Sequence, residues 1–161
     1  MDYLWTPWRY QYVSQPAAAG NQACIFCEAL KRKDDAATLI LFCGRLNFIL
    51  LNRYPYTTGH AMIAPLEHVG ELERATPETL AEMMALAQRL ARAYAAEYKP
   101  EGYNLGMNLG KSAGAGVADH LHLHVLPRWA GDTSFMTTVG ETRLEPEELS
   151  TTYTKLKKHF G

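Results

Sequence analysis

The sequence predicts an α+β fold in which a mostly antiparallel sheet packs against one long helix. Two short apolar runs, residues 38–42 and 46–51, are separated by Cys43-Gly44, a pattern typical of a β-hairpin. Residues 60–64 form a third short apolar run, which Pro65 closes. A helical pattern follows, and then two more strand-like segments at residues 103–109 and 120–126. A hairpin, a crossing helix and two further strands together favour an α+β protein.

The main helix is expected to begin after Thr76, which is a suitable N-cap, with Pro77 at the first helical position. Its apolar residues recur with helical period and therefore share one face: Leu80, Met83, Ala87, Leu90, Ala91, Tyr94 and Tyr98. We expect both Met83 and Met84 to lie in the core. A second amphipathic helix is expected near the C-terminus, over residues 146–160.

Length and composition indicate one compact domain. The chain has 161 residues, of which 47% are hydrophobic, and a net charge of -1. A charge so close to zero argues against binding nucleic acid through bulk electrostatics. No segment has the roughly 20 apolar residues that a membrane helix needs, and the start does not resemble a signal peptide. We therefore expect a cytoplasmic protein that binds neither nucleic acid nor membrane.

The first residues differ in character from the rest. Residues 1–21 form an expected N-terminal arm, in which Trp5, Trp8, Tyr10 and Tyr12 supply apolar surface. Such an arm is expected to pack on its own domain or on a partner subunit. Residues 22–161 are expected to form a single catalytic domain.

Three histidines alternate along the last predicted strand. Side chains in a strand point alternately to opposite faces. We therefore expect one face to pack on the core through Leu121, Leu123 and Val125, and the other face to carry His120, His122 and His124. The simplest alternative is a polar strand face that happens to contain histidine. The glycine-rich loop at residues 110–116 argues against it, because such loops offer backbone N–H groups to phosphate oxygens.

Histidine beside a phosphate-binding loop indicates phosphoryl chemistry. A neutral imidazole is a good nucleophile near neutral pH and needs no separate base. One ring nitrogen must face phosphorus with a free lone pair, while the other donates its proton to a fixed acceptor. His122 is the best-placed candidate, since it is flanked by the other two histidines.

The motif His-Leu-His-Leu-His at residues 120–124 resembles the signature of the histidine triad (HIT) family. Further segments resemble the same family: residues 51–56 (LNRYPY), Gly59-His60, residues 104–110 and residues 126–129 (LPRW) with Gly131-Asp132. Residues 4–9 (LWTPWR) and 126–132 resemble bacterial diadenosine tetraphosphate phosphorylases within the fragile-histidine-triad-like branch of the family. The resemblance covers nearly the whole chain.

The resemblance implies a HIT-like fold with a five-stranded antiparallel sheet, one main helix and a C-terminal helix, in a homodimer. It implies cleavage of dinucleoside polyphosphates through a nucleotidyl-histidine intermediate on His122. His124 would contact the phosphate, and His60 would support the histidine cluster without contacting the substrate. Asn52 would bind the ribose, and Asn108 with the backbone of Gly116 and Val117 would bind phosphate. Leu41, Phe42 and Phe48 are candidates for the wall around adenine, and Trp129 for stacking on a base or closing the pocket.

Cys24 and Cys27 have the spacing of paired thiolates on one zinc ion. A redox pair would follow a strand, which is not evident here, and buried apolar cysteines remain an alternative. By resemblance to metal-binding HIT proteins, the ligands would be Cys24, Cys27, His68 and His120, which is a closed, structural set. Zinc on His120 would steady the backbone carbonyl that accepts the ring N–H of His122. No organic cofactor is expected.

Two functions compete with the cleavage of dinucleoside polyphosphates. A purine nucleoside phosphoramidase would use the same His122 on a P–N bond. A non-catalytic, zinc-stabilised nucleotide-binding module would have no use for a nucleophile. The acceptor of the nucleotidyl group is either inorganic phosphate or water, and the branch resemblance favours phosphate.

Overall fold

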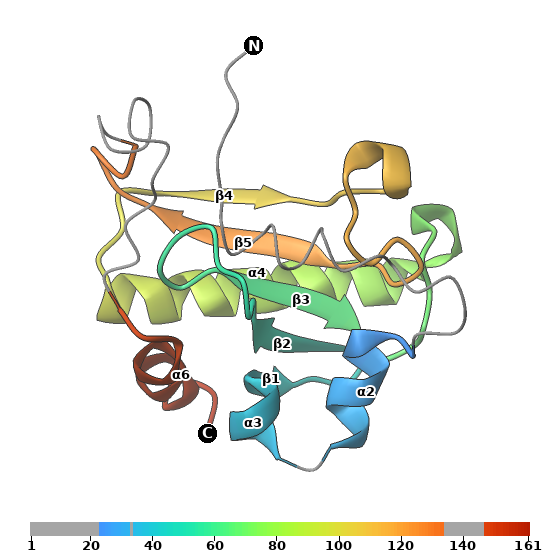
Figure 1. Cartoon of the computed structure of the whole chain (residues 1–161), viewed down its shortest axis with the longest axis horizontal. Coiled ribbons are helices and arrows are strands. Elements are labelled where there is room, and N and C mark those ends of the chain that lie inside the picture. The colour runs from blue at the N-terminus through green and yellow to red at the C-terminus, as the bar shows by residue number, and fades with distance from the viewer. Residues whose placement is uncertain (1–22, 33, 134–146) are drawn as a thin grey trace.

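The computed structural model describes residues 23–32, 34–133 and 147–161. It contains a five-stranded antiparallel sheet with the strand order β1-β2-β3-β5-β4 (Figure 1). The α+β fold predicted from the sequence is confirmed. The predicted arm at residues 1–21 lies outside the described residues. In the described part of the chain, no helix has both the length and the apolar character required to cross a membrane.

The strands lie close to their predicted positions: β1 Ile40–Cys43, β2 Asn47–Leu51, β3 Ala61–Pro65, β4 Gly102–Gly106 and β5 Leu123–Arg128. β1 and β2 form the predicted antiparallel hairpin. β5 pairs with β3 on one side and with β4 on the other. The end of the histidine motif therefore lies inside the sheet, where two neighbouring strands fix its backbone.

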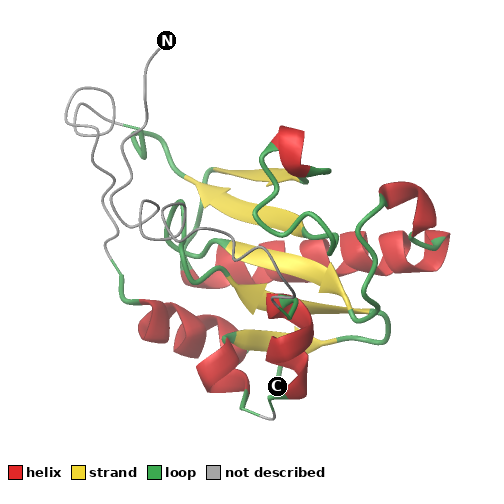
Figure 2. Cartoon of the chain, turned by 45° about the vertical axis from the view of Figure 1, so that its right-hand side comes forward, coloured by secondary structure: helices red, strands yellow, loops and turns green. Residues whose placement is uncertain are grey.

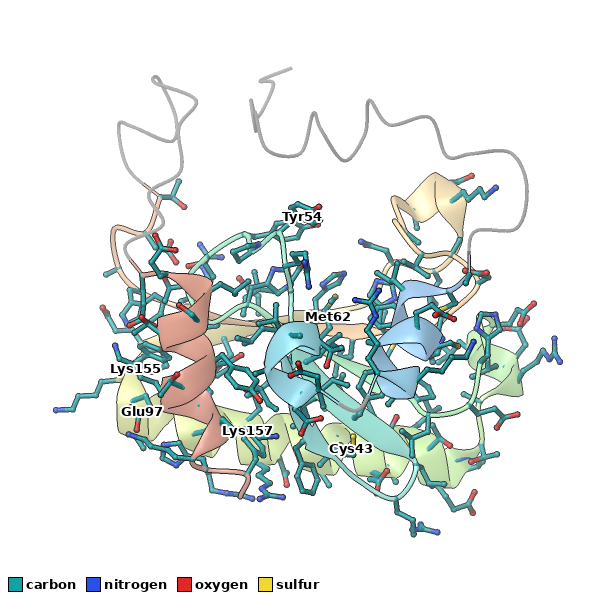
Figure 3. The ribbon with its side chains drawn as sticks, turned by 60° about the horizontal axis from the view of Figure 1, so that its bottom comes forward. Cys43, Tyr54, Met62, Glu97, Lys155 and Lys157 are labelled. Carbon is teal, nitrogen blue, oxygen red and sulfur yellow. The ribbon has the colours of Figure 1, made fainter. Side chains whose placement is uncertain are left out.

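One long helix lies along one face of this sheet, and a short helix packs against part of the other face (Figures 1 and 2). The bounds of the helices are α2 Ile25–Lys31, α3 Asp35–Thr38, α4 Pro77–Glu97 and α6 Leu149–Lys157, with 3₁₀ helices η1 Leu72–Arg74 and η2 Lys111–Ala113. Thr76 caps α4 as predicted, since its side chain accepts a hydrogen bond from the backbone N–H of Thr79. α6 lies near α3, where Lys157 pairs with Asp35 at 2.8 Å (Figure 3). The sequence did not predict α2 or α3.

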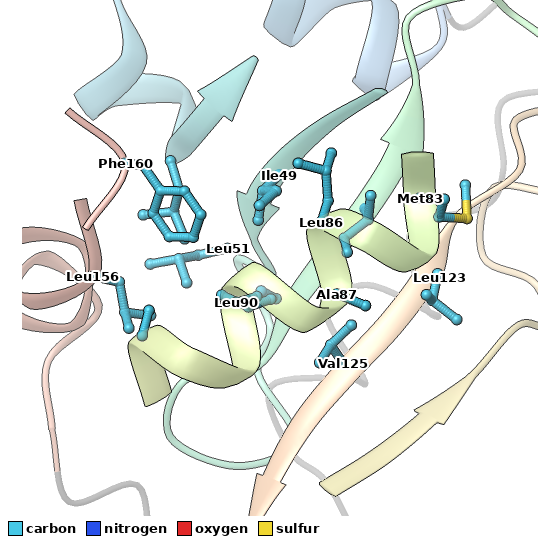
Figure 4. Packing of buried hydrophobic residues seen from close by; sticks show 14 of the residues in the cluster. Ile49, Leu51, Met83, Leu86, Ala87, Leu90, Leu123, Val125, Leu156 and Phe160 are labelled. Atoms are coloured by element: carbon cyan, nitrogen blue, oxygen red, sulfur yellow. The ribbon is translucent and has the colours of Figure 1, made fainter. Parts of the chain in front are cut away.

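Alternation along β2 divides the buried side chains into two clusters. Ile49 and Leu51 face α4 in the main core, whereas Phe48 and Leu50 face α2 in a smaller cluster. The main core also contains Leu90 of α4 and Val125 of β5 (Figure 4). The smaller cluster consists of Phe26, Ile40, Phe48, Leu50, Met62 and Ala64.

One detail of the predicted core is wrong. Met83 is buried as expected, but Met84 is 52% exposed. Consecutive residues on a helix are separated by about 100°, so both cannot face the same sheet. Leu86 and Ala93 are buried on α4 although the predicted stripe did not include them.

Glu82 of α4 fastens the turn between β1 and β2. Its carboxylate accepts hydrogen bonds from the backbone N–H groups of Arg45 at 2.9 Å and Leu46 at 2.6 Å, and from Nδ2 of Asn47 at 3.0 Å. Burial raises the pKa of Glu82, but the hydrogen bonds from Asn47 and the turn outweigh it and leave the pKa below its usual value of 4.5. The charged carboxylate therefore stabilises the fold.

Replacing this carboxylate is expected to destabilise the protein in a pH-dependent way. Glu82→Gln should lower the free energy of unfolding at neutral pH by about 1–3 kcal/mol, because one amide cannot accept all three bonds. Since the folded pKa is depressed, the contribution is present above the unfolded value and is lost as the pH falls through the folded value. Urea unfolding between pH 7 and about pH 3 measures the difference.

The exposed Glu73 of η1 provides the control for this substitution. Glu73→Gln should change the free energy of unfolding by less than about 0.5 kcal/mol at neutral pH. Equal effects of the two substitutions, or a Glu82→Gln effect that does not shrink in acid, would contradict the role of the carboxylate.

Candidate active site

Four histidines gather on the side of the sheet away from α4. Leu121, Leu123 and Val125 lie in the core against α4, as their alternation predicted. The intervening side chains of His122 and His124 therefore point away from α4, and their rings lie 4.9 Å apart between centroids. β5 begins only at Leu123, so His122 lies just before the first strand residue.

The ring of His122 is held in one tautomer. Its Nδ1 lies 2.8 Å from the backbone carbonyl oxygen of His120. Because a carbonyl can only accept, Nδ1 carries the proton and Nε2 keeps its lone pair. Burial lowers the pKa of His122, although the bond to His120 opposes this shift. The 6% exposed ring is therefore an uncharged imidazole near neutral pH.

A second chain of bonds fixes the tautomer of His124. The backbone N–H of Tyr56 donates to Nδ1 of His60 at 3.1 Å, so this nitrogen must be an acceptor. The proton of the neutral His60 ring then lies on Nε2, which donates to Nδ1 of His124 at 2.9 Å. His124 in turn carries its proton on Nε2. Nε2 of His122 therefore offers a lone pair, whereas Nε2 of His124 offers an N–H.

A pocket of about 500 Å³ opens beside these two rings. It brings together most of the substrate-binding residues predicted from the sequence, namely Asn52, Asn108, Gly116 and Val117, with His122 and His124. Its apolar lining comes from α2 and from the sheet side: Ile25, Phe26, Ala29, Leu39, Leu50 and Met62. Met62 and Tyr54, which both line this pocket, are labelled in Figure 3.

Two predicted pocket residues lie elsewhere. The Phe42 ring lies 5.8 Å from the ring of Phe160, with the guanidinium of Arg89 4.2 Å from its centroid. A bulge in β1 between Ile40 and Phe42 shifts the register, and Phe42 packs against the main core. Trp129 donates from Nε1 to the carbonyl of Tyr98 at the end of α4, at 3.2 Å.

The other wall candidates also lie outside this pocket lining. Leu41 is fully buried in the main core and Phe48 in the smaller cluster. The sequence predicted an adenine-binding wall from apolar residues of β1 and β2, but it did not predict α2, which supplies part of the apolar lining. A helix of seven residues is too short for periodicity to reveal it. Glu28 in its first turn and Lys31 in its last were the available signals.

The four predicted metal ligands also come together. One potential ligand atom each from Cys24, Cys27, His68 and His120 lies within 4.8 Å of the others. Sγ of Cys24 is 3.2 Å from Nδ1 of His120, and Sγ of Cys27 is 3.4 Å from Nδ1 of His68. These separations suit a tetrahedral site with sulfur and nitrogen ligands.

The protonation of His120 also suits a metal ligand. Its Nε2 donates to the carbonyl of Pro65 at 2.9 Å, which leaves the lone pair of Nδ1 directed at the cysteines. Burial lowers the pKa of His120, so the ring is neutral, as a ligand must be. Nε2 of His68 lies 3.8 Å from a carboxylate oxygen of Asp119, which is beyond hydrogen-bond distance. The third cysteine, Cys43, is exposed on β1 (Figure 3).

The chain is similar to known proteins over much of its length. The model of the HIT domain matches residues 34–131. An AP-4-A phosphorylase of Mycobacterium tuberculosis is 39% identical over 158 residues, which cover 94% of this chain and 80% of that protein. An adenosine 5'-monophosphoramidase of Schizosaccharomyces pombe is 31% identical over 106 residues, covering 66% of this chain and 74% of the relative.

A solved structure is similar over most of the chain. It is a Zn-bound histidine triad family protein from Mycobacterium smegmatis, with a TM-score of 0.70 and 31% sequence identity. The match covers 87% of this chain and 94% of that protein.

The hydrogen-bond pattern predicts opposite tautomers within the cluster. Two-bond ¹H–¹⁵N correlation spectra at neutral pH should show His122 protonated at Nδ1, and His60 and His124 protonated at Nε2, because each acceptor is fixed by its partner. The pattern should vanish in urea, where no such partners exist. The same tautomer on all three rings would refute the assignment.

Proposed function

This chain belongs to the HIT domain family, and we propose that it cleaves dinucleoside polyphosphates such as diadenosine tetraphosphate through a nucleotidyl group carried on His122. The main support is the neutral His122 ring, whose Nε2 lone pair is available beside the pocket while His120 holds Nδ1–H. The relative that is 39% identical and named AP-4-A phosphorylase supports this substrate class.

In the first step, Nε2 of His122 attacks the α-phosphorus of the bound nucleotide. A P–N bond forms, and the P–O bond to the rest of the polyphosphate breaks with its electron pair on the leaving oxygen. The ring becomes positively charged, and the carbonyl of His120 stabilises that charge through the Nδ1–H bond. Nε2–H of His124 donates to the negative charge on the leaving group.

In the second step, an acceptor oxygen attacks the same phosphorus. The P–N bond breaks and its electron pair returns to Nε2 of His122. Inorganic phosphate as acceptor gives ADP, with ATP already released, whereas water gives AMP and ATP. The phosphorylase name of the 39% identical relative favours phosphate.

We assign the nucleotide to the pocket in three parts. The base lies between the apolar residues of α2 and those of the sheet side. The ribose binds Asn52, whose side chain is held by the N–H of Tyr54 at 3.0 Å and donates to His60 at 3.3 Å. The phosphates bind Asn108 and the loop that contains Gly116 and Val117, which offer backbone N–H groups.

We further propose that Cys24, Cys27, His68 and His120 hold a structural zinc ion. Two thiolates and two imidazoles are a typical zinc donor set, and the four atoms are already gathered. When bound, the ion would supply folding energy and no reactive water, because four protein ligands close the site. The Zn-bound neighbour of 31% identity supports this assignment.

A homodimer in the cytoplasm is also part of the proposal. β4 is an edge strand of the sheet, and Leu105 on it is 45% exposed, so a second copy has backbone and apolar surface to pair with. The proposed zinc site needs Cys24 and Cys27 as thiolates, and a reducing compartment such as the cytoplasm keeps them from forming a disulfide.

Product analysis tests the proposed reaction. The protein is incubated with diadenosine tetraphosphate, with and without inorganic phosphate, and the nucleotides are separated. We expect ADP only when phosphate is present, and without phosphate we expect no more ATP than the single equivalent per site that the first step releases. AMP in both samples would show that water is the acceptor, and no cleavage in either would refute the proposed substrate.

Removing the proposed nucleophile is expected to abolish turnover. His122→Asn should lower kcat by at least roughly 1,000-fold, because the amide of asparagine has no nucleophilic nitrogen to form the P–N bond. Cys43→Ser, on the exposed end of β1, is the control and should keep the parent rate. A His122→Asn variant that turns over substrate normally would favour a non-catalytic binding module.

The second candidate is a nucleoside phosphoramidase. The 31% identical adenosine 5'-monophosphoramidase supports it, and the same His122 could attack a phosphorus bound to nitrogen. Comparing kcat/KM for an adenosine phosphoramidate and for diadenosine tetraphosphate decides between them. A value at least roughly 100-fold higher for the phosphoramidate would overturn the first proposal.

Zinc binding is tested by metal analysis. We expect one zinc ion for each chain, and a lower temperature of unfolding after chelation, because the ion links α2 to the sheet. Cys27→Ser should lose the metal, whereas Cys43→Ser should retain it. Zinc retained by Cys27→Ser, or unfolding unaffected by chelation, would contradict the assignment.

A further inference from the structure

Phe26 occupies a central position between the metal-ligand cluster and His122. It lies in the first turn of α2, between Cys24 and Cys27 in the sequence, and is 1% exposed. The centroid of its ring lies 5.1 Å from that of His120 and 5.1 Å from that of His122, with tilts of 52° and 42°. One aromatic side chain thus contacts both imidazoles.

The His122 ring needs such a contact to keep its orientation. The hydrogen bond from Nδ1 to the carbonyl of His120 fixes one atom of the ring. A single hydrogen bond leaves the ring plane free to tilt, and a tilt would move Nε2 out of line with the phosphorus that it attacks. Phe26 packs against the ring, and His124 contacts it at 76° and 4.9 Å. Packing therefore restrains the motion that the hydrogen bond permits.

Phe26 is itself held firmly. Its ring packs edge-on against Phe48 of β2, with centroids 6.3 Å apart. The adjoining cysteines approach His120, at 3.2 Å from Cys24 and 3.7 Å from Cys27. α2 is thus anchored on both sides of Phe26. Because Phe26 is held in place, its ring can in turn restrain the ring of His122.

We propose that Phe26 is a positioning residue that holds the imidazole of His122 in its attacking orientation. The effect on rate rests on the proposed function, but the effect on the ring does not. Phe26 also lines the pocket, so a plain role as base-binding wall is the alternative. A wall residue affects KM, whereas a residue that orients the nucleophile affects kcat.

Three variants separate these roles. Phe26→Ala removes the ring, Phe26→Leu keeps most of its apolar volume, and Leu30→Ala is the matched control. Leu30 lies on the same helix and packs against the same cluster, but it is outside the pocket lining. Urea unfolding confirms that each variant is folded, and Phe26→Val replaces the alanine variant should that one not fold.

We expect Phe26→Ala to lower kcat on diadenosine tetraphosphate by roughly 10- to 100-fold, with KM changed by less than about threefold. Phe26→Leu should restore kcat to within about threefold of the parent, and Leu30→Ala should match the parent. A higher KM with normal kcat in Phe26→Ala would overturn the proposal, as would an equal loss in Leu30→Ala.

A second readout needs no substrate. The ring ¹⁵N and ¹³C signals of His122 in the free protein should show exchange broadening in Phe26→Ala, which loss of the ring current of Phe26 alone would not cause, and should stay as sharp as in the parent in Leu30→Ala. His122 signals that stay as sharp in Phe26→Ala as in the parent would overturn the proposal even where the rate falls. If no variant or parent cleaves the dinucleotide, the proposed function fails and these signals still test the positioning.

Discussion

The hydrogen bond from Nδ1 of His122 to the carbonyl of His120 is the interaction on which the site depends. At 2.8 Å it places the ring proton on the side away from the pocket and leaves Nε2 with a lone pair. Burial of the same ring disfavours its charged form, which keeps that lone pair available near neutral pH. One carbonyl thus decides the tautomer, and with it which ring nitrogen is the reactive atom.

That carbonyl belongs to His120, whose own side chain is held by other partners. The ring of His120 is held between the carbonyl of Pro65 and the thiols of α2. The backbone of residue 120 is therefore fixed from two sides, and the ligand cluster lies next to the pocket without opening into it. Tyr56 performs a comparable task for the other half of the site, because its N–H sets the tautomer of His60 and, through it, that of His124.

The sequence predicted the features that depend on local pattern. Alternation placed Leu121, Leu123 and Val125 in the core and so directed the histidines to the other side, and the Thr76 cap began α4. What the sequence missed depends on tertiary contacts. The bulge in β1 turned Phe42 away from the pocket, and α2 was too short to recognise, so that Phe26 was not considered. The prediction that Met84 is buried was wrong, because the adjacent Met83 and Met84 cannot both face the core from one helix.

The central claim is a covalent bond between phosphorus and Nε2 of His122, and trapping that bond tests it most directly. The protein is mixed with diadenosine tetraphosphate in the absence of phosphate, quenched in alkali and analysed by peptide mass spectrometry. We predict one adenylyl group on the peptide that contains residue 122, and its loss when phosphate is added before the quench. Turnover with no adenylylated peptide, or an adenylyl group on another residue, would contradict the account.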